Sequence, residues 1–134
     1  MRPGERSLAA ARAVLGVGFR LHGRDAAGGL DCVGLAALAM QAEGFEGHVP
    51  IGYALRTGDS GMAQRAIEAA GLVPAETERP GDLLLVAAGP GQLHLAIAAG
   101  DGVVHADAQL RRVVERPGPI PWPVIGRWRP AERG

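Results

Sequence analysis

The stretch "DCVGLAALAMQAEGF", residues 31–45, predicts a helix that begins at the only cysteine of the chain. Asp31 is a typical N-cap and Gly44 a typical C-terminal stop. Cys32 is therefore expected in the first turn, where unpaired amide donors and the helix dipole favour a thiolate, although the neighbouring Asp31 opposes a second negative charge. Apolar residues recur at the spacing of one helix face, at Leu35, Leu38, Ala39 and Ala42.

Two further helices are predicted around this one. Ser7 followed by "LAAARAVLGV" predicts an N-capped helix that ends near residues 16–18. Another helix is expected over residues 59–71, with Asp59 or Ser60 at its start. The face expected to be buried in the first of these helices consists of Leu8, Ala11 and Leu15.

The second half of the chain changes to the short, branched segments typical of antiparallel strands. Such segments begin at Asp82, Leu93, Val103 and Leu110, and "VIGRWR" at 124–129 can close the sheet. Helices followed by strands predict an α+β domain, with one helical layer packed on a C-terminal antiparallel sheet. A length of 134 residues fits one domain, 1–134.

Composition excludes several classes of function. Basic and acidic residues balance at 14 each, so we expect no nucleic acid and no membrane surface as a partner. A single cysteine cannot form an internal disulfide. Glu5, Arg6 and Arg12 interrupt the apolar N-terminal stretch, which therefore does not resemble a signal peptide. We expect a protein that is cytoplasmic when made.

A nucleophilic thiol needs a base and a group that orients the base. In "QLHLAIAAGDGVVHA", residues 92–106, two histidines alternate with apolar residues, so both can project from one face of a hairpin toward the helix of Cys32. His94 and His105 are the candidates. Read alone, Cys32 can also be a buried small hydrophobe and each histidine a structural residue.

The hairpin register decides whether the two histidines can meet. A tight turn at residues 101–102 pairs Ala98 with His105 and leaves His94 roughly 13 Å away along the strand. A wider loop, a bulge or strong twist is then needed to shorten that distance. In the tight-turn register Gln109 opposes His94, which makes Gln109 a reserve orienting residue.

Three blocks resemble the signatures of the NlpC/P60 family of papain-like cysteine peptidases: "GLDCVGL", "RPGDLLLV" and "HLAIAAGDGVVHA". The resemblance covers nearly the whole chain. Within the family, the compact domain is similar to the phage-type cell-wall peptidase branch. It implies a papain-like fold with Cys32 as nucleophile, His94 as general base and His105 as orienting group. The implied substrate is the peptidoglycan stem peptide, cut after D-glutamate and before the diamino acid. No metal and no cofactor are implied, and phage-tail or gene-transfer-particle proteins are implied partners.

The resemblance also marks substrate-binding candidates. Phe19 stands where the family often has a tyrosine near the oxyanion; either His22 or Arg20 compensates, or catalysis is weaker. Val33 replaces a common serine after the nucleophile. Asp31 matches a carboxylate that faces a substrate amine in relatives, or it is an N-cap only. Tyr53 either lines the cleft or packs with its hydroxyl at the surface.

Other functions remain open at this point. The same acyl-enzyme can transfer its acyl group to an amine or alcohol instead of water. A catalytically impaired module can bind wall peptides or build a phage tail. A zinc-binding structural domain would use Cys32, His94, His105 and Asp107, but the sequence has no closely spaced ligand pair.

Overall fold

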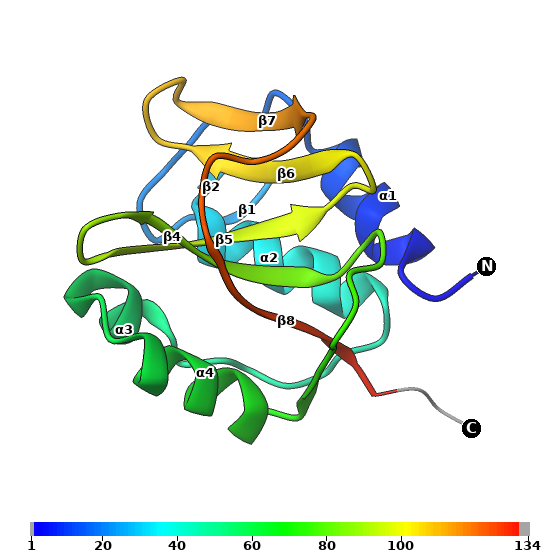
Figure 1. The fold of residues 1–134 in the computed structure, drawn as a ribbon. Helices are drawn as coiled ribbons and strands as arrows, with labels where there is room; N and C mark the ends of the chain where they lie inside the picture. Colours follow the sequence, from blue (N-terminus) through cyan, green and yellow to red (C-terminus); the bar gives the residue numbers. More distant parts are fainter. Residues whose placement is uncertain (1, 132–134) are drawn as a thin grey trace.

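Six antiparallel strands form the main sheet, in the order β3-β8-β4-β5-β6-β7, and the helices lie mainly to one side of it (Figure 1). This computed structural model describes residues 2–131. The predicted α+β architecture is confirmed. In chain order the elements are α1 (Glu5–Ala13), β1 (Arg24–Asp25), β2 (Gly29–Leu30), α2 (Cys32–Ala42), α3 (Gly52–Thr57), α4 (Ser60–Ala69), β3 (Leu72–Pro74), β4 (Leu83–Gly89), β5 (Gln92–Ala98), β6 (Gly102–Asp107), β7 (Arg112–Pro117) and β8 (Val124–Pro130).

Helix α2 begins as predicted. The Asp31 side chain accepts a hydrogen bond from the Gly34 amide at 2.8 Å, which makes Asp31 the N-cap and Cys32 the first helical residue. The helix ends just before Gly44, whose φ of 96° lies in the left-handed region that glycine adopts readily. Its buried face is rotated from the predicted one: Leu35, Ala36, Ala39 and Met40 are buried, whereas Leu38 and Ala42 are half-buried.

Helix α1 differs from its prediction at both ends. Ser7 is not its N-cap, because the helix begins at Glu5 and Ser7 is buried inside it, donating from Oγ to the Gly81 carbonyl at 2.8 Å. Leu15 is 42% exposed, because the helix has already ended and the chain has turned toward β7.

The cap of α1 comes from the far end of α2. The Glu43 carboxylate accepts from the amides of Gly4 at 2.9 Å and Ser7 at 3.0 Å. These amides have no intrahelical partner, and a carboxylate also suits the positive end of the helix dipole. Glu43 therefore ties the first helix to the helix that carries the cysteine.

The longer predicted strands β4 to β8 are confirmed, while α3 and the short strands β1, β2 and β3 were not predicted. Two or three residues are too short for alternation to be read, and α3 has one buried residue, Ala54. The predicted helix over 59–71 is α4, capped by Asp59 through the Met62 amide at 2.9 Å.

Apolar residues cover both faces of the sheet. The helical face forms the larger core, which includes Leu35, Ile67, Leu85, Ile97 and Trp128. The opposite face carries a smaller cluster, covered by the segment leading into β8, with Leu84, Val86, Ala96, Ala98, Val103, Ile120, Trp122 and Val124. This arrangement explains why β4 is an unbroken apolar run. Within the described residues, no helix has the length and apolar character needed to cross a membrane.

Candidate active site

Strands β5 and β6 pair only near their connecting loop and separate toward the end where the two histidines lie. Next to their connecting loop the strands pair through Ile97↔Val104 and Ala98↔Val103, and the Ala99 amide donates to the Gly102 carbonyl at 2.9 Å. Of the two registers considered, the structure has the one with the wider loop, and the tight-turn pairing of Ala98 with His105 does not occur. The observed register sets His105 two positions, rather than four, from His94, and imidazole rings can meet across that offset.

The two imidazoles are in hydrogen-bond contact. His94 Nε2 lies 3.0 Å from His105 Nδ1, and the ring planes are nearly perpendicular at 87°. His105 is 4% exposed. Because a hydrogen bond between two neutral imidazoles needs one donor and one acceptor, the tautomers of the two rings are linked.

Asp107 stands on the other side of His105. Its Oδ2 is 4.0 Å from His105 Nε2, while its Oδ1 accepts from the amides of Gln109 at 2.8 Å and Leu110 at 3.0 Å. Gln109 itself lies exposed in the β6–β7 turn. Of the two candidates for orienting His94, His105 is the one in contact with it, and Gln109 contacts Asp107 through its backbone amide.

Trp122 covers the histidine pair. Its ring centroid lies 5.8 Å from that of His94 and 5.2 Å from that of His105, both in edge-to-face geometry. The Arg116 guanidinium lies 5.9 Å from the Trp122 centroid. Sequence analysis did not place Trp122 at the site; the available signal was a tryptophan held between two prolines in "PWP".

The Cys32 thiol reaches the opening in the sheet. Amides alternate in direction along β5: that of Ala98 donates to Asp82 at the β4 side, and that of Ala99 to Gly102 at the β6 side. The Leu95 amide shares the direction of Ala99 and hydrogen-bonds the Cys32 sulfur. Because β5 and β6 separate here, the Leu95 amide has no partner on β6 and is free to bind the thiol. Leu95 is the residue after His94.

Burial dominates the electrostatics of these groups. It raises the pKa of the Cys32 thiol to about 11, with Asp31 adding to the rise and the Leu95 amide opposing it. Burial and the neighbouring His105 lower the pKa of His94 to about 4, and burial lowers that of His105. The helix N-terminus therefore does not yield the low thiol pKa that its position suggested.

Asp107 remains a carboxylate in this setting. Burial raises its pKa, but the amides of Leu110 and Gln109, together with His105 and His94, outweigh burial and hold the pKa below its ordinary value. A negative charge therefore faces His105 at neutral pH.

Asp31 holds the loop before α2 in place. Besides the Gly34 amide it accepts from the His22 amide at 2.8 Å and from Arg24 Nη1 at 2.7 Å, and it is 6% exposed. The same junction is close-packed, since a Cβ at Gly34 would overlap the carbonyl oxygen of Gly23. Both carboxylate oxygens serve the fold, which favours the N-cap interpretation of Asp31.

The other substrate-binding candidates lie in different surroundings. Phe19 is half-buried against the main core, and its amide donates to the Arg111 carbonyl. His22 is exposed, with a φ of 63°. Val33 is half-buried beside Cys32, whereas Tyr53 is 61% exposed on α3.

Solved structures give the fold a family likeness. The chain superposes on NlpC2 from Trichomonas vaginalis with a TM-score of 0.72 and 20% identity, covering 96% of this chain and 48% of that one. The NlpC/P60 domain of the peptidoglycan hydrolase SagA gives 0.54 and 27%, covering 85% and 88%. The chain has the NlpC/P60 fold. The P60 domain of an antigen from M. avium subspecies paratuberculosis agrees, at 0.53 and 23%, covering 94% and 92%.

The chain spans about half the length of the Trichomonas protein. It matches no family model and no curated protein at the level required for significance. Likeness to the SagA domain extends over most of both chains.

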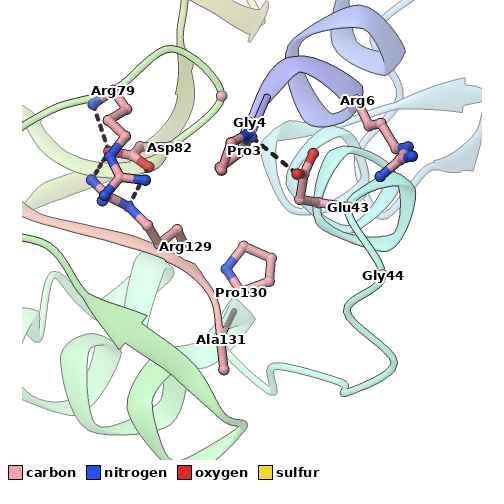
Figure 2. Close-up of a pocket in the computed structure, with 11 residues that line it drawn as sticks. Pro3, Gly4, Arg6, Glu43, Gly44, Arg79, Asp82, Arg129, Pro130 and Ala131 are labelled. Atoms are coloured by element: carbon pink, nitrogen blue, oxygen red, sulfur yellow. Dashed lines mark hydrogen bonds and ion pairs between the residues drawn. The ribbon is translucent and has the colours of Figure 1, made fainter. Parts of the chain in front are cut away.

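A polar cavity of about 380 Å³ lies at the far end of α2 from Cys32 (Figure 2). It is bounded by Glu43, which caps α1, and by Asp82, which accepts two hydrogen bonds from Arg129 at 2.9 and 2.8 Å. Neither Cys32 nor His94 lines it. Within residues 2–131, no group of three or more His, Cys, Asp or Glu side chains gathers as a metal site.

Proposed function

We propose that the protein is a cysteine peptidase that hydrolyses an amide bond of peptidoglycan stem peptides. The observation that carries the proposal is the 3.0 Å contact between His94 and His105, together with a thiol at the start of a helix that accepts the amide of Leu95, the residue after His94. Likeness to a domain of a peptidoglycan hydrolase supports the substrate class.

Asp107 supports one assignment of protons in this array. A proton on His105 Nε2 faces the Asp107 carboxylate, which leaves His105 Nδ1 as an acceptor. His94 must then donate from Nε2, so its Nδ1 carries a lone pair. In the proposed mechanism this lone pair takes the proton of the Cys32 thiol.

The pKa values support general-base catalysis from a neutral resting state. With the thiol pKa near 11 and that of His94 near 4, both groups are uncharged at pH 7. The thiol proton moves to His94 as the sulfur attacks the carbonyl carbon, which avoids a standing thiolate. His94 returns that proton to the departing amine, and water then hydrolyses the thioester.

The oxyanion of the tetrahedral intermediate needs donors near Cys32. We assign one donor to the Cys32 backbone amide, at the first position of α2. Phe19 supplies no hydroxyl, so the site relies on backbone donors and on the exposed His22 nearby.

We further propose the bond between D-glutamate and the diamino acid as the point of cleavage, and association with phage-tail or gene-transfer-particle proteins as the setting. Both stay predictions from the sequence. Acyl transfer to an amine remains the alternative use of the same thioester.

The test is incubation of the protein with the tripeptide L-Ala–D-Glu–diaminopimelate, followed by mass spectrometry of the products. Hydrolysis gives the dipeptide and free diamino acid, whereas an added amine acceptor gives a heavier conjugate if transfer dominates. Cys32→Ala and His94→Ala should each abolish the products while circular dichroism shows a retained fold. Unchanged cleavage by Cys32→Ala would overturn the proposal.

A further inference from the structure

An apolar groove of about 480 Å³ runs along α2, between this helix and the extended segment at residues 45–51. This volume is in the range of small-molecule sites. Its walls include Ala36, Ala37 and Met40 from α2 and Phe45 and Ile51 from the segment. Apolar side chains make up most of the lining.

One end of the groove lies near the thiol, although Cys32 does not itself line it. Val33, the residue after Cys32, lines the groove, and so does Leu95, whose amide binds the Cys32 sulfur. A group attached to an acyl carbon on that sulfur therefore has a nearby apolar channel to enter.

Charged groups at this end of the groove already have partners. Arg24 Nη1 binds Asp31 at 2.7 Å, and Asp25 Oδ1 accepts the Gly28 amide at 2.5 Å. Gln41 and His48 lie at the exposed edge. A charged ligand group would lose its hydration inside the groove without gaining a counter-charge, which favours an uncharged occupant.

We propose that this groove binds an uncharged aliphatic group on the acyl side of the bond that Cys32 attacks. The inference rests on the proposed role of Cys32 as nucleophile. It widens the substrate class from polar stem peptides to acyl donors that carry an alkyl chain.

The reaction with a model ester balances as follows. The Cys32 sulfur bonds to the carbonyl carbon, the thiol proton passes to His94, and the ester C–O bond breaks to release p-nitrophenolate. His94 then releases that proton to the solvent, and water cleaves the thioester to give the carboxylic acid and the free thiol.

The experiment measures acylation of the full chain by p-nitrophenyl acetate, butyrate, hexanoate and octanoate. The Cys32→Ala rate is subtracted, and mass spectrometry identifies the thioester. Each methylene that enters the groove should raise kcat/KM for acylation about fourfold until the groove is filled. Ala37→Phe, which fills the groove, should flatten this dependence on chain length. Ala69→Phe, at an exposed helical position outside the groove, should retain it.

The outcomes separate the two proposals. Absence of any Cys32-dependent burst would overturn the nucleophile and the groove assignment together. A burst with equal rates for all four esters would overturn the groove assignment alone. A chain-length dependence that persists in folded Ala37→Phe would also overturn it, and Ala37→Leu replaces this variant if the phenylalanine prevents folding.

Discussion

Asp107 uses its two carboxylate oxygens for different tasks: Oδ1 binds the amides of the β6–β7 turn, and Oδ2 faces His105 Nε2 at 4.0 Å. The side chain thus couples a turn to the histidine pair. Asparagine can keep the first task and reverse the second, because it presents an NH₂ donor where the carboxylate has an acceptor.

Asp107→Asn should therefore lower kcat about 10- to 100-fold with little change in Tm, since the wrong tautomer of His105 opposes donation by His94. Steady-state kinetics and the ¹⁵N shifts of both imidazoles check this expectation. Asp101→Asn, in an exposed loop of the same hairpin, is the matched control. Wild-type kcat and unchanged imidazole shifts in Asp107→Asn would refute the proton assignment.

Alkylation of Cys32 by iodoacetamide should keep rising with pH to about 11, without a plateau near 8.5. Burial raises the thiol pKa to about 11, so the reactive thiolate is scarce at neutral pH. The same protein unfolded in urea should react with an ordinary thiol pKa of about 8.5 and serves as the control. A plateau below pH 8 in the folded protein would contradict the role given to burial.

Trp122→Ala should shift the acid limb of the activity profile from about pH 4 toward 6.5. Removing the ring lets water reach His94, which weakens the burial that lowers its pKa. Trp122→Phe, which keeps a ring over the pair, should hold the acid limb near pH 4. Coincident pH–kcat profiles of the two variants would mean that Trp122 does not shield the imidazoles.

Acid should also destabilise the fold through His94. Its pKa is lowered on folding from about 6.5 to about 4, so the unfolded chain binds more protons between these values. The contribution of His94 to the free energy of unfolding is fully present above pH 6.5 and is lost as pH falls to 4. Urea titrations of wild type and His94→Gln between pH 4 and 7 measure it. Equal slopes with pH would exclude His94 as the source.

Gly34→Ala should destabilise the protein by about 1–3 kcal/mol and lower activity, because the new methyl overlaps the Gly23 carbonyl and pushes the preceding loop off α2. Gly61→Ala in α4 is the matched control: its methyl meets the flexible end of Arg65, and alanine is the better helix former. Chemical denaturation of both variants measures the difference. Equal stability of the two would show that the junction at Gly34 can relax.

Local patterns predicted much of the site. The start of α2 at Cys32 follows from one capping carboxylate and the helical period, and strand alternation placed His94 and His105 on one face. That face does not point toward the helix of Cys32 as expected: it carries the smaller apolar cluster with Trp122. The pairing of the hairpin did not follow, because loop length sets the register and "AAGDG" permits more than one loop.

Features that depend on contacts between distant segments could not be predicted from the sequence. Ser7 resembles a cap, yet Glu43 performs that task from 36 residues away in the sequence. The thiol pKa was expected to fall at a helix N-terminus, but the half-buried setting of Cys32 raises it, and that burial depends on packing that no local pattern encodes.

The hydrogen bond between the Leu95 amide and the Cys32 sulfur makes one backbone position a natural spectroscopic reporter. Its proton chemical shift will respond to every change at the sulfur, from thiol to thiolate to thioester. The rate at which this amide proton exchanges with deuterium will record how often the structure opens locally between β5 and β6. A single ¹⁵N-labelled leucine can thus follow turnover and local opening in one sample, without a chromophore on the substrate.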